Sequence, residues 1–219
     1  MADDYAQAMR VTKQEHACLV LEKVDQRIVI DPGAYTTPLI GIDGVVAIVI
    51  THEHADHWTP EHLARIMERN PEAVIFGPRG VAAAAADYTV IEVADGDHHE
   101  VGGFSLHFFG EKHAVIHPSI PVIDNVGVMV DDLLFYPGDS YTVPPVPVDT
   151  LAAPAGAPWL KISEAMDYVS AVAPKRCFPT HQMVLSKIGQ KLANDRLRAV
   201  TESAGGEYLE LEPDQSLDL

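Results

Sequence analysis

Residues 51–57 read Thr-His-Glu-His-Ala-Asp-His, and this segment constrains the fold of the chain more than any other. Four side chains that bind metals well lie within six positions: His52, His54, Asp56 and His57. The apolar run 45–50 before them has the length and continuity of a strand that is covered on both faces. A threonine and a proline at 59–60 start a helix. The sequence therefore predicts a buried strand, a metal-binding turn and a helix.

The spacing within this segment indicates how its side chains point. His52 and His54 are two positions apart at the end of a strand, so an extended backbone points both to one side. The chain then turns, and Asp56 and His57 face a neighbouring point. The pattern differs from that of helical metalloproteases, because Asp56 stands where the second histidine would be. One strand end cannot complete a metal shell, so we expect further ligands at other strand ends.

Three more candidate ligands follow predicted strands: His113 after 104–109, Asp139 after 133–136 and His181 after 176–178. Together with the first four they supply the number of ligands that two ions require. His117 is the alternative to His113, as a ligand or as a proton donor, and His113 is favoured because it follows the strand more closely. We predict Asp56 and His117 as catalytic residues. The predicted metal ligands are His52, His54, Asp56, His57, His113, Asp139 and His181.

Strand and helix patterns interleave along the chain. Helices are expected over 59–70, 79–86, 162–172 and 187–203. Strands are expected near 17–21, 27–30, 45–50, 73–76, 90–93, 104–109, 125–130, 133–136, 176–178 and 207–211. The segment 141–158 is rich in proline and glycine, which predicts a surface loop. This order predicts a layered α/β fold with two sheets. No long linker divides the chain, so we expect one metallo-hydrolase domain over residues 1–219.

These motifs in order resemble the metallo-β-lactamase-fold hydrolase superfamily. Asp31, within Ile-Asp-Pro-Gly, matches an aspartate near the start of the family's domain. In the family this residue supports the metal loop, which is residues 51–57 here, without binding metal. The resemblance covers residue 11 to about residue 211. It implies a four-layer αββα sandwich of two mixed β-sheets flanked by helices, with the site at one edge of the packed sheets.

The resemblance also implies roles for the candidate ligands. It places His52, His54 and His113 on one ion, Asp56, His57 and His181 on the other, and Asp139 between them. The segment 157–161, Ala-Pro-Trp-Leu-Lys, is most similar to the small lactonase-like and uncharacterised hydrolases of the superfamily. β-Lactamases of this fold commonly carry a cysteine at the position of Asp139, so hydrolysis of β-lactams is not favoured.

The ligand types indicate the chemistry. Two divalent ions about 3.5–4 Å apart make hydroxide available near neutral pH. Imidazole and carboxylate ligands suit zinc, with manganese and iron as alternatives. Two such ions, two carboxylates and one hydroxide leave a formal charge of about +1, which favours a small anionic or carbonyl-containing substrate. We predict a dinuclear hydrolase of a small ester, lactone or phosphodiester. The alternatives are a mononuclear iron persulfide dioxygenase of the same fold and a non-catalytic metal-binding module.

Composition limits the partners and the compartment. Acidic residues outnumber basic ones 32 to 15, for a net charge of -17, which disfavours nucleic acid and anionic membranes. Cys18 and Cys177 lie in strand-like runs and are expected to be buried free thiols. The acidic start 1–10 lacks the apolar core of a secretory signal, and no apolar run has the length of a membrane span. We expect a cytoplasmic protein, and the sequence leaves an oligomer possible.

Several residues have two interpretations. His16 either reaches the rim of the site or lies on an outward face of a strand. Tyr141, Trp159 and Lys161 either line a substrate pocket or pack beside prolines.

Overall fold

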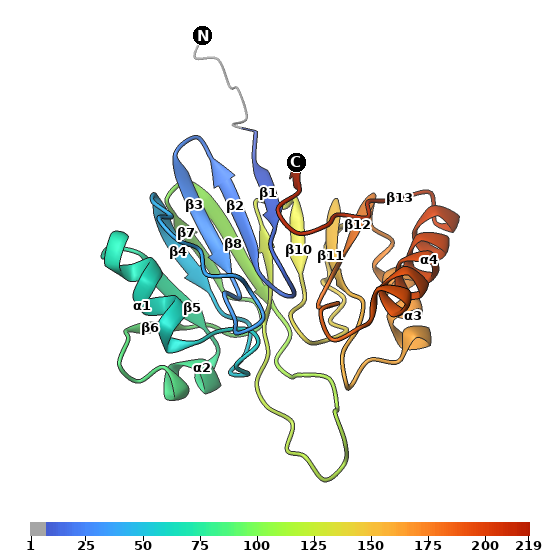
Figure 1. The fold of residues 1–219 in the computed structure, drawn as a ribbon, viewed down its shortest axis with the longest axis horizontal. Helices are drawn as coiled ribbons and strands as arrows, with labels where there is room; N and C mark the ends of the chain where they lie inside the picture. The colour runs from blue at the N-terminus through green and yellow to red at the C-terminus, as the bar shows by residue number, and fades with distance from the viewer. Residues whose placement is uncertain (1–7) are drawn as a thin grey trace.

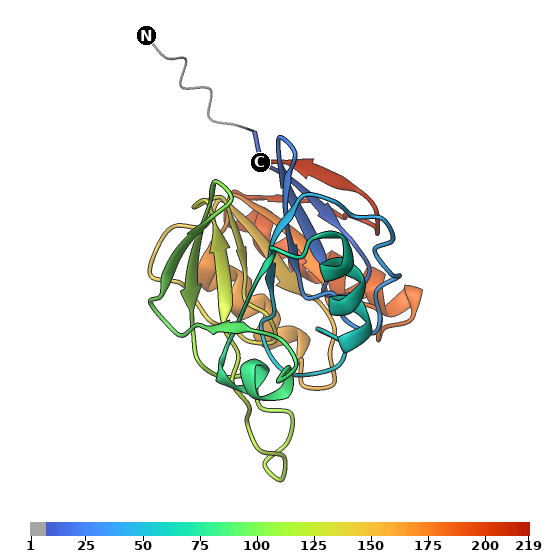
Figure 2. The ribbon, with the colours of Figure 1, turned by 90° about the vertical axis from the view of Figure 1, so that its left-hand side faces the viewer.

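Within residues 8–219, two seven-stranded sheets pack face to face in the computed structural model, and a pair of helices covers the outer face of each sheet (Figures 1 and 2). The structure describes residues 8–219. Residues 1–7, which hold most of the segment for which we expect no secretory signal, lie outside the described residues. The predicted αββα sandwich of two mixed sheets is confirmed.

The first sheet combines antiparallel and parallel pairing. In spatial order its strands are β14 (Ser216–Asp218), β1 (Arg10–Lys13), β2 (Leu19–Lys23), β3 (Gln26–Ile30), β4 (Val45–Val49), β5 (Val74–Gly77) and β6 (Val90–Glu92). The pairs from β14 to β3 are antiparallel, and those from β3 to β6 are parallel. Parallel strands need long connections. Helix α1 (Pro60–Arg69) connects β4 to β5, and α2 (Arg79–Ala84) connects β5 to β6.

The second sheet repeats this division. Its order is β13 (Glu207–Tyr208), β12 (Arg176–Thr180), β11 (Thr150–Pro154), β10 (Leu134–Tyr136), β9 (Gly127–Val130), β8 (Phe104–Phe109) and β7 (His98–Val101). Strands β7 to β10 pair antiparallel, and β10 to β13 pair parallel. Helices α3 (Ile162–Val172) and α4 (Lys187–Ser203), drawn in orange and red in Figure 1, cover its outer face.

Burial on both faces explains the continuous apolar runs of the central strands. In β3, Ile28 and Ile30 face the core between the sheets, and Val29 faces the core beneath the helices α1 and α2. In β4, Val49 faces the inner core and Ile48 the outer one. Successive side chains of a strand point to opposite faces, so a strand in the middle of four layers needs apolar residues at every position.

Two expectations about the fold are corrected. The segment 141–158 is not a loop throughout, because its residues 150–154 form β11, which is fully buried between β10 and β12. The prolines and glycines on both sides of this five-residue strand hid it in the sequence. The expected strand over 207–211 is only the two-residue β13, and the short β14 that pairs with β1 was not predicted.

Other expectations agree with the structure. The helices α3 and α4 begin and end where the sequence predicted. Cys18 and Cys177 are buried and unpaired, as predicted. Within residues 8–219, no helix is both long and apolar enough to cross a membrane.

The packing predicts a stability difference between two apolar residues. Phe108 is fully buried between the sheets, whereas Ile40 is 84% exposed. We expect Phe108→Ala to lower the free energy of unfolding by about 3–5 kcal/mol, because it leaves a cavity in the inner core. Ile40→Ala is the control and should change it by less than about 0.5 kcal/mol. Denaturant unfolding measures both, and equal losses would contradict the placement of Phe108.

Candidate metal centre

Loops from both sheets bring the candidate ligands together. The first sheet contributes the loop after β4, with His52, His54, Asp56 and His57, and the turn between β1 and β2, with His16. The second sheet contributes His113 after β8, Asp139 after β10 and His181 after β12. Ligand sites of α/β sheets commonly lie at the carboxyl ends of the strands, where loops converge.

The ligand atoms form two compact groups. We call His52, His54, His113 and Asp139 the first group, and His16, Asp56, His57 and His181 the second group. Within each group, the ligand atoms all lie within 4.8 Å of one another. The groups contain all seven ligands expected from the sequence and one more, His16. That these residues coordinate ions stays a prediction.

Asp139 faces both groups. Its Oδ2 lies 3.4 Å from Nε2 of His113 in the first group and 3.1 Å from Nε2 of His181 in the second. Its Oδ1 lies 3.3 Å from Nε2 of His57. The carboxylate therefore has the position that a ligand shared by two ions requires.

Buried polar atoms at the centre of the site fit a bound cation. Nε2 of His57, His113 and His181 and Oδ1 of Asp139 are buried and make no hydrogen bond to any described residue. Buried polar atoms in proteins are ordinarily paired. Imidazole nitrogens and carboxylate oxygens that converge in this way are the usual ligands of zinc and related divalent ions. The residues present therefore fit the two-ion site that the superfamily implies.

The outer nitrogens of these rings are fixed by neighbours. His181 Nδ1 donates to the carbonyl of Gly156 at 2.7 Å, and His113 Nδ1 donates to the carbonyl of Ala114 at 2.5 Å. His57 Nδ1 donates to Oδ2 of Asp31 at 2.7 Å. A hydrogen bond of this kind sets the tautomer and leaves Nε2 free to bind a metal.

Asp31 supports the metal loop, in agreement with the role expected for it. It follows β3 directly, is fully buried and has a φ of 46°. Its Oδ1 accepts from the Thr51 amide at 2.8 Å, and its Oδ2 accepts from the Thr51 hydroxyl at 2.7 Å. It thus ties the end of β3 to the start of the loop that carries His52 to His57.

Close approach of the backbone requires glycine at two positions beside the ligands. A Cβ at Gly33 would lie 1.8 Å from the carbonyl oxygen of Asp56. Gly138 has a φ of +64°, and its Cβ would lie 2.7 Å from Cβ of Thr51. Larger residues at either position would displace the metal loop.

His16 is the site residue whose place the sequence left undecided. Its side chain is fully buried, and its Nε2 lies 3.1 Å from Oδ2 of Asp56. Its carbonyl accepts from the amide of His181 at 2.8 Å, and the two rings lie 3.9 Å apart. The signal available in the sequence was a histidine in a turn between two strands, and that signal does not show which neighbour the turn meets.

His117 lies outside both groups of ligand atoms. It is exposed on the loop between β8 and β9, where its Nδ1 accepts from the amide of Ser119 at 3.1 Å. The geometry therefore favours His113 as the ligand from this segment. A catalytic role for His117 stays a prediction.

Charges within the site offset one another. Burial opposes ionisation of Asp139, but the nearby His57 and His181 hold the pKa of its carboxyl well below the usual range. Burial alone would lower the pKa of His181, and the carboxylates of Asp139 and Asp56 instead raise it to about 9. The pKa of His57 is also raised, because Asp139 and Asp31 outweigh its burial. The positive charge of these histidines therefore stabilises the buried carboxylate of Asp139 and the partly buried carboxylate of Asp56.

Comparison with known proteins identifies the family. Residues 10–181 match the model of the beta-lactamase superfamily domain. The chain belongs to this superfamily. Protein Rv0786c of Mycobacterium tuberculosis is 39% identical over 199 residues, which cover 88% of this chain and 93% of that protein. UPF0173 protein PF0020 of Pyrococcus furiosus is 27% identical over 187 residues, which cover 79% of this chain and 83% of that protein.

Solved structures share the fold. Igni18, a metallo hydrolase from Ignicoccus hospitalis, has a TM-score of 0.74 and 16% identity, with 97% of this chain and 98% of that one covered. CmlA, a diiron β-hydroxylase from Streptomyces venezuelae, has a TM-score of 0.71 and 16% identity, with 97% of this chain and 54% of that one covered. At these identities the likeness concerns the fold, whereas the match to the family model over residues 10–181 confirms the superfamily predicted from the sequence.

The raised pKa values predict that metal binding releases protons. At pH 7, below the raised pKa values of His57 and His181, both rings are protonated in the ion-free protein. A metal binds only neutral imidazole, so zinc binding at pH 7 should release about two protons, and affinity should rise as the pH approaches 9. Calorimetry in buffers of different ionisation enthalpy measures this release. Zinc binding at pH 7 without proton release would contradict it.

The position of His16 predicts a contrast with His117. We expect His16→Gln to weaken the binding of at least one ion by at least about tenfold, because the second group loses a ligand or a close partner of one. His117→Gln should bind both ions as the unsubstituted protein does. Metal content after dialysis at a series of free zinc concentrations distinguishes them, and the opposite ranking would show that the geometry misassigns His16.

Proposed function

We propose that this protein is a dinuclear metal-dependent hydrolase of a small ester, lactone or phosphodiester. The observation that carries the proposal is the pair of four-residue ligand groups with the carboxylate of Asp139 facing both. A single-ion site would need only one such group. Because β14 near the carboxyl end pairs with β1 near the amino end, we extend the proposal to one metallo-hydrolase domain over the whole chain.

The residues named above would hold the two ions. Ions bound there would supply hydroxide near neutral pH and stabilise the negative charge that develops on a substrate oxygen. We propose zinc as the native metal, with manganese or iron as alternatives, because imidazole and carboxylate ligands suit all three.

The two carboxylates of the site differ in exposure. The side chain of Asp56 is 24% exposed and that of Asp139 is 3% exposed. Asp56 also contacts His16, which orients its Oδ2. We therefore assign Asp56 the transfer of protons between the site and solvent, in addition to its place in the second group. Asp139, at 3% exposure, is less suited to proton exchange with solvent.

A cavity of about 550 Å³ beside the first group offers a place for a small substrate. Its lining includes the ligand His113 and an edge-to-face pair of aromatic rings, Tyr141 and Trp159, 5.3 Å apart. Val115 adds apolar surface, and Glu164 lies at the wall. This volume is in the range of small-molecule sites and supports a small substrate over a polymer. We propose that the substrate is anionic or carries a carbonyl group, attracted by the ions.

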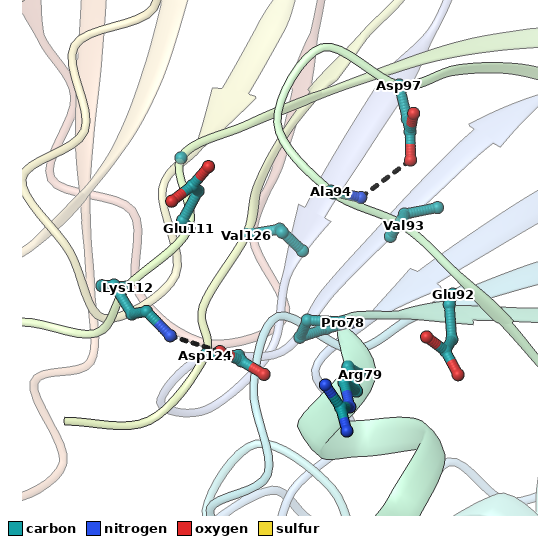
Figure 3. A pocket seen from close by; sticks show the side chains of 11 residues that line it. Pro78, Arg79, Glu92, Val93, Ala94, Asp97, Glu111, Lys112, Asp124 and Val126 are labelled. Atoms are coloured by element: carbon teal, nitrogen blue, oxygen red, sulfur yellow. Dashed lines mark hydrogen bonds and ion pairs between the residues drawn. The ribbon is translucent and has the colours of Figure 1, made fainter. Parts of the chain in front are cut away.

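A second cavity, of about 310 Å³, is less suited to the reaction (Figure 3). Its lining includes Lys112 and Asp124, which form an ion pair of 2.7 Å, and none of the eight residues of the two groups. Glu92 and Asp97 add negative charge to this lining, and Arg79 adds positive charge (Figure 3). A substrate bound there would not contact the ligands.

Oxygen chemistry is the second candidate. The fold likeness to CmlA, a diiron β-hydroxylase, supports iron-dependent oxidation on the same scaffold. A mononuclear persulfide dioxygenase would leave one of the two ligand groups without use, so the geometry favours it less. A non-catalytic metal-binding module has no need for the substrate-sized cavity beside the first group. We also propose that the protein acts without nucleic-acid or membrane partners, because a net charge of -17 disfavours both, and a cytoplasmic location stays a prediction.

One experiment tests the proposed function. Ion-free protein is loaded with zinc, manganese or iron and assayed against lactones, thioesters and phosphodiesters, with oxygen consumption followed in parallel. We expect about two ions per chain and hydrolysis of at least one class. Asp139→Ala should retain the fold, lose at least one ion and lose about a hundredfold or more in kcat/KM. Asp132→Ala, on an exposed turn, is the matched control and should keep both ions and an unchanged kcat/KM.

The outcomes separate the candidates. Oxygen consumption with iron and no hydrolysis would show that the protein is an oxygenase and not a hydrolase. Two bound ions without turnover of any substrate would favour the binding module. An Asp139→Ala variant with normal activity would refute the place of Asp139 between the ions.

A further inference from the structure

We propose that Trp159 is a positioning residue whose indole N–H holds the carboxylate of Asp139 in the orientation that faces both ligand groups. The inference rests on the proposed function, because it assigns a purpose to the orientation of Asp139. Trp159 is not a candidate metal ligand and is not adjacent to one in the sequence.

The contact is direct. Trp159 lies between β11 and α3 and is 8% exposed. Its Nε1 donates to Oδ2 of Asp139 at 2.8 Å. This is the same oxygen that lies between His113 and His181, at 3.4 and 3.1 Å from their Nε2 atoms.

The other anchors of Asp139 fix its main chain and leave the carboxylate free to rotate. Its amide donates to Oδ1 of Asn125 at 2.9 Å, and its carbonyl accepts from the amide of Ala114 at 2.8 Å. Among the described residues, the indole of Trp159 is the one partner that donates a well-formed hydrogen bond to the carboxylate oxygens. Without it, the side chain would be oriented only by histidines that are themselves candidate ligands.

The chemistry of indole suits this task. An indole N–H is a donor only, and it neither ionises near neutral pH nor coordinates zinc. The contacts of the histidines with Asp139 would change if their nitrogens bound ions, whereas we expect the bond from Trp159 to be kept, because the indole N–H has no other use in the site. Partners of this kind orient ligands, and their loss typically weakens metal binding about 10- to 100-fold.

Packing holds the indole in place over both groups. Its ring lies edge-on to Tyr141, with centroids 5.3 Å apart, and to His113 at 5.8 Å. It also lies 6.4 Å from the ring of His181 in the second group. Trp159 lines the 550 Å³ cavity as well, so one side chain contacts both the proposed substrate pocket and the shared carboxylate.

Zinc affinity of ion-free protein tests the inference. We expect Trp159→Phe to weaken the binding of at least one zinc ion about 10- to 100-fold, measured by calorimetry in competition with a chelator. The matched control is Tyr208→Phe, which removes one hydrogen bond of another buried aromatic residue, from its hydroxyl to Oδ1 of Asn194 at 3.0 Å, outside both ligand groups. Tyr208→Phe should bind zinc within about twofold of the unsubstituted protein. Equal affinities in the two variants would overturn the inference.

An isosteric analogue separates the hydrogen bond from packing. Benzothienylalanine, in which sulfur takes the place of the N–H and the ring keeps its shape, can be incorporated site-specifically at position 159 alone. The analogue should lose zinc affinity as Trp159→Phe does. If it binds zinc as tightly as the tryptophan protein, the ring acts by packing alone and the inference is wrong.

A third measurement needs no metal and so separates this inference from the proposed function. Ion-free Trp58→Phe protein has a single indole N–H, whose proton resonance should lie downfield and move upfield on Asp139→Ala, because the bond to a charged oxygen is lost. A resonance that does not move would overturn the inference even if two ions bind. Failure of the unsubstituted protein to bind two ions, with the resonance shift present, would reject the proposed function and retain the bond.

Discussion

The hydrogen bonds to the buried carboxylate of Asp31 are the interactions on which the rest of the site depends. Left alone in this interior it would cost several kcal/mol, and donors from Thr51 and His57 satisfy it instead. Those donors lie at the start and at the end of the metal loop, so satisfying one charge fixes the loop's path. His57 then presents its Nε2 toward Asp139, and Asp139 connects the loop to the second sheet. The need to pair the charge of Asp31 therefore determines the position of the loop that carries His52 to His57.

Local sequence predicted the parts of the site that depend on local geometry. The candidate ligands of residues 52–57 follow one strand, and His113, Asp139 and His181 each follow another, so strand prediction was enough to nominate them, whereas their division between two ions came from the family resemblance. His16 was not placed, because its position depends on a contact with His181, which lies across the interface between the sheets. No pattern near residue 16 carries that information.

Dependence on distant parts of the chain also explains the errors in the predicted fold. β14 is three residues long, and its partner β1 lies at the opposite end of the chain, so nothing in residues 216–218 signals pairing. β11 is covered on both faces and therefore lacks the alternation that identifies half-buried strands. The helices α3 and α4 were predicted to the residue because amphipathic periodicity is a local property. Non-local contacts account for what the sequence did not show.

The ligands come from both sheets, and this has a consequence for the stability of the sandwich. Both cysteines are free, so no covalent bridge joins the layers. Ions bound between His52–His57 on one sheet and His113, Asp139 and His181 on the other would act as reversible cross-links. By mass action, a ligand that binds only the folded state at about a hundred times its Kd adds about 2.7 kcal/mol of stability. The supply of metal would then determine how stable the association of the two sheets is, much as a disulfide stabilises a secreted domain.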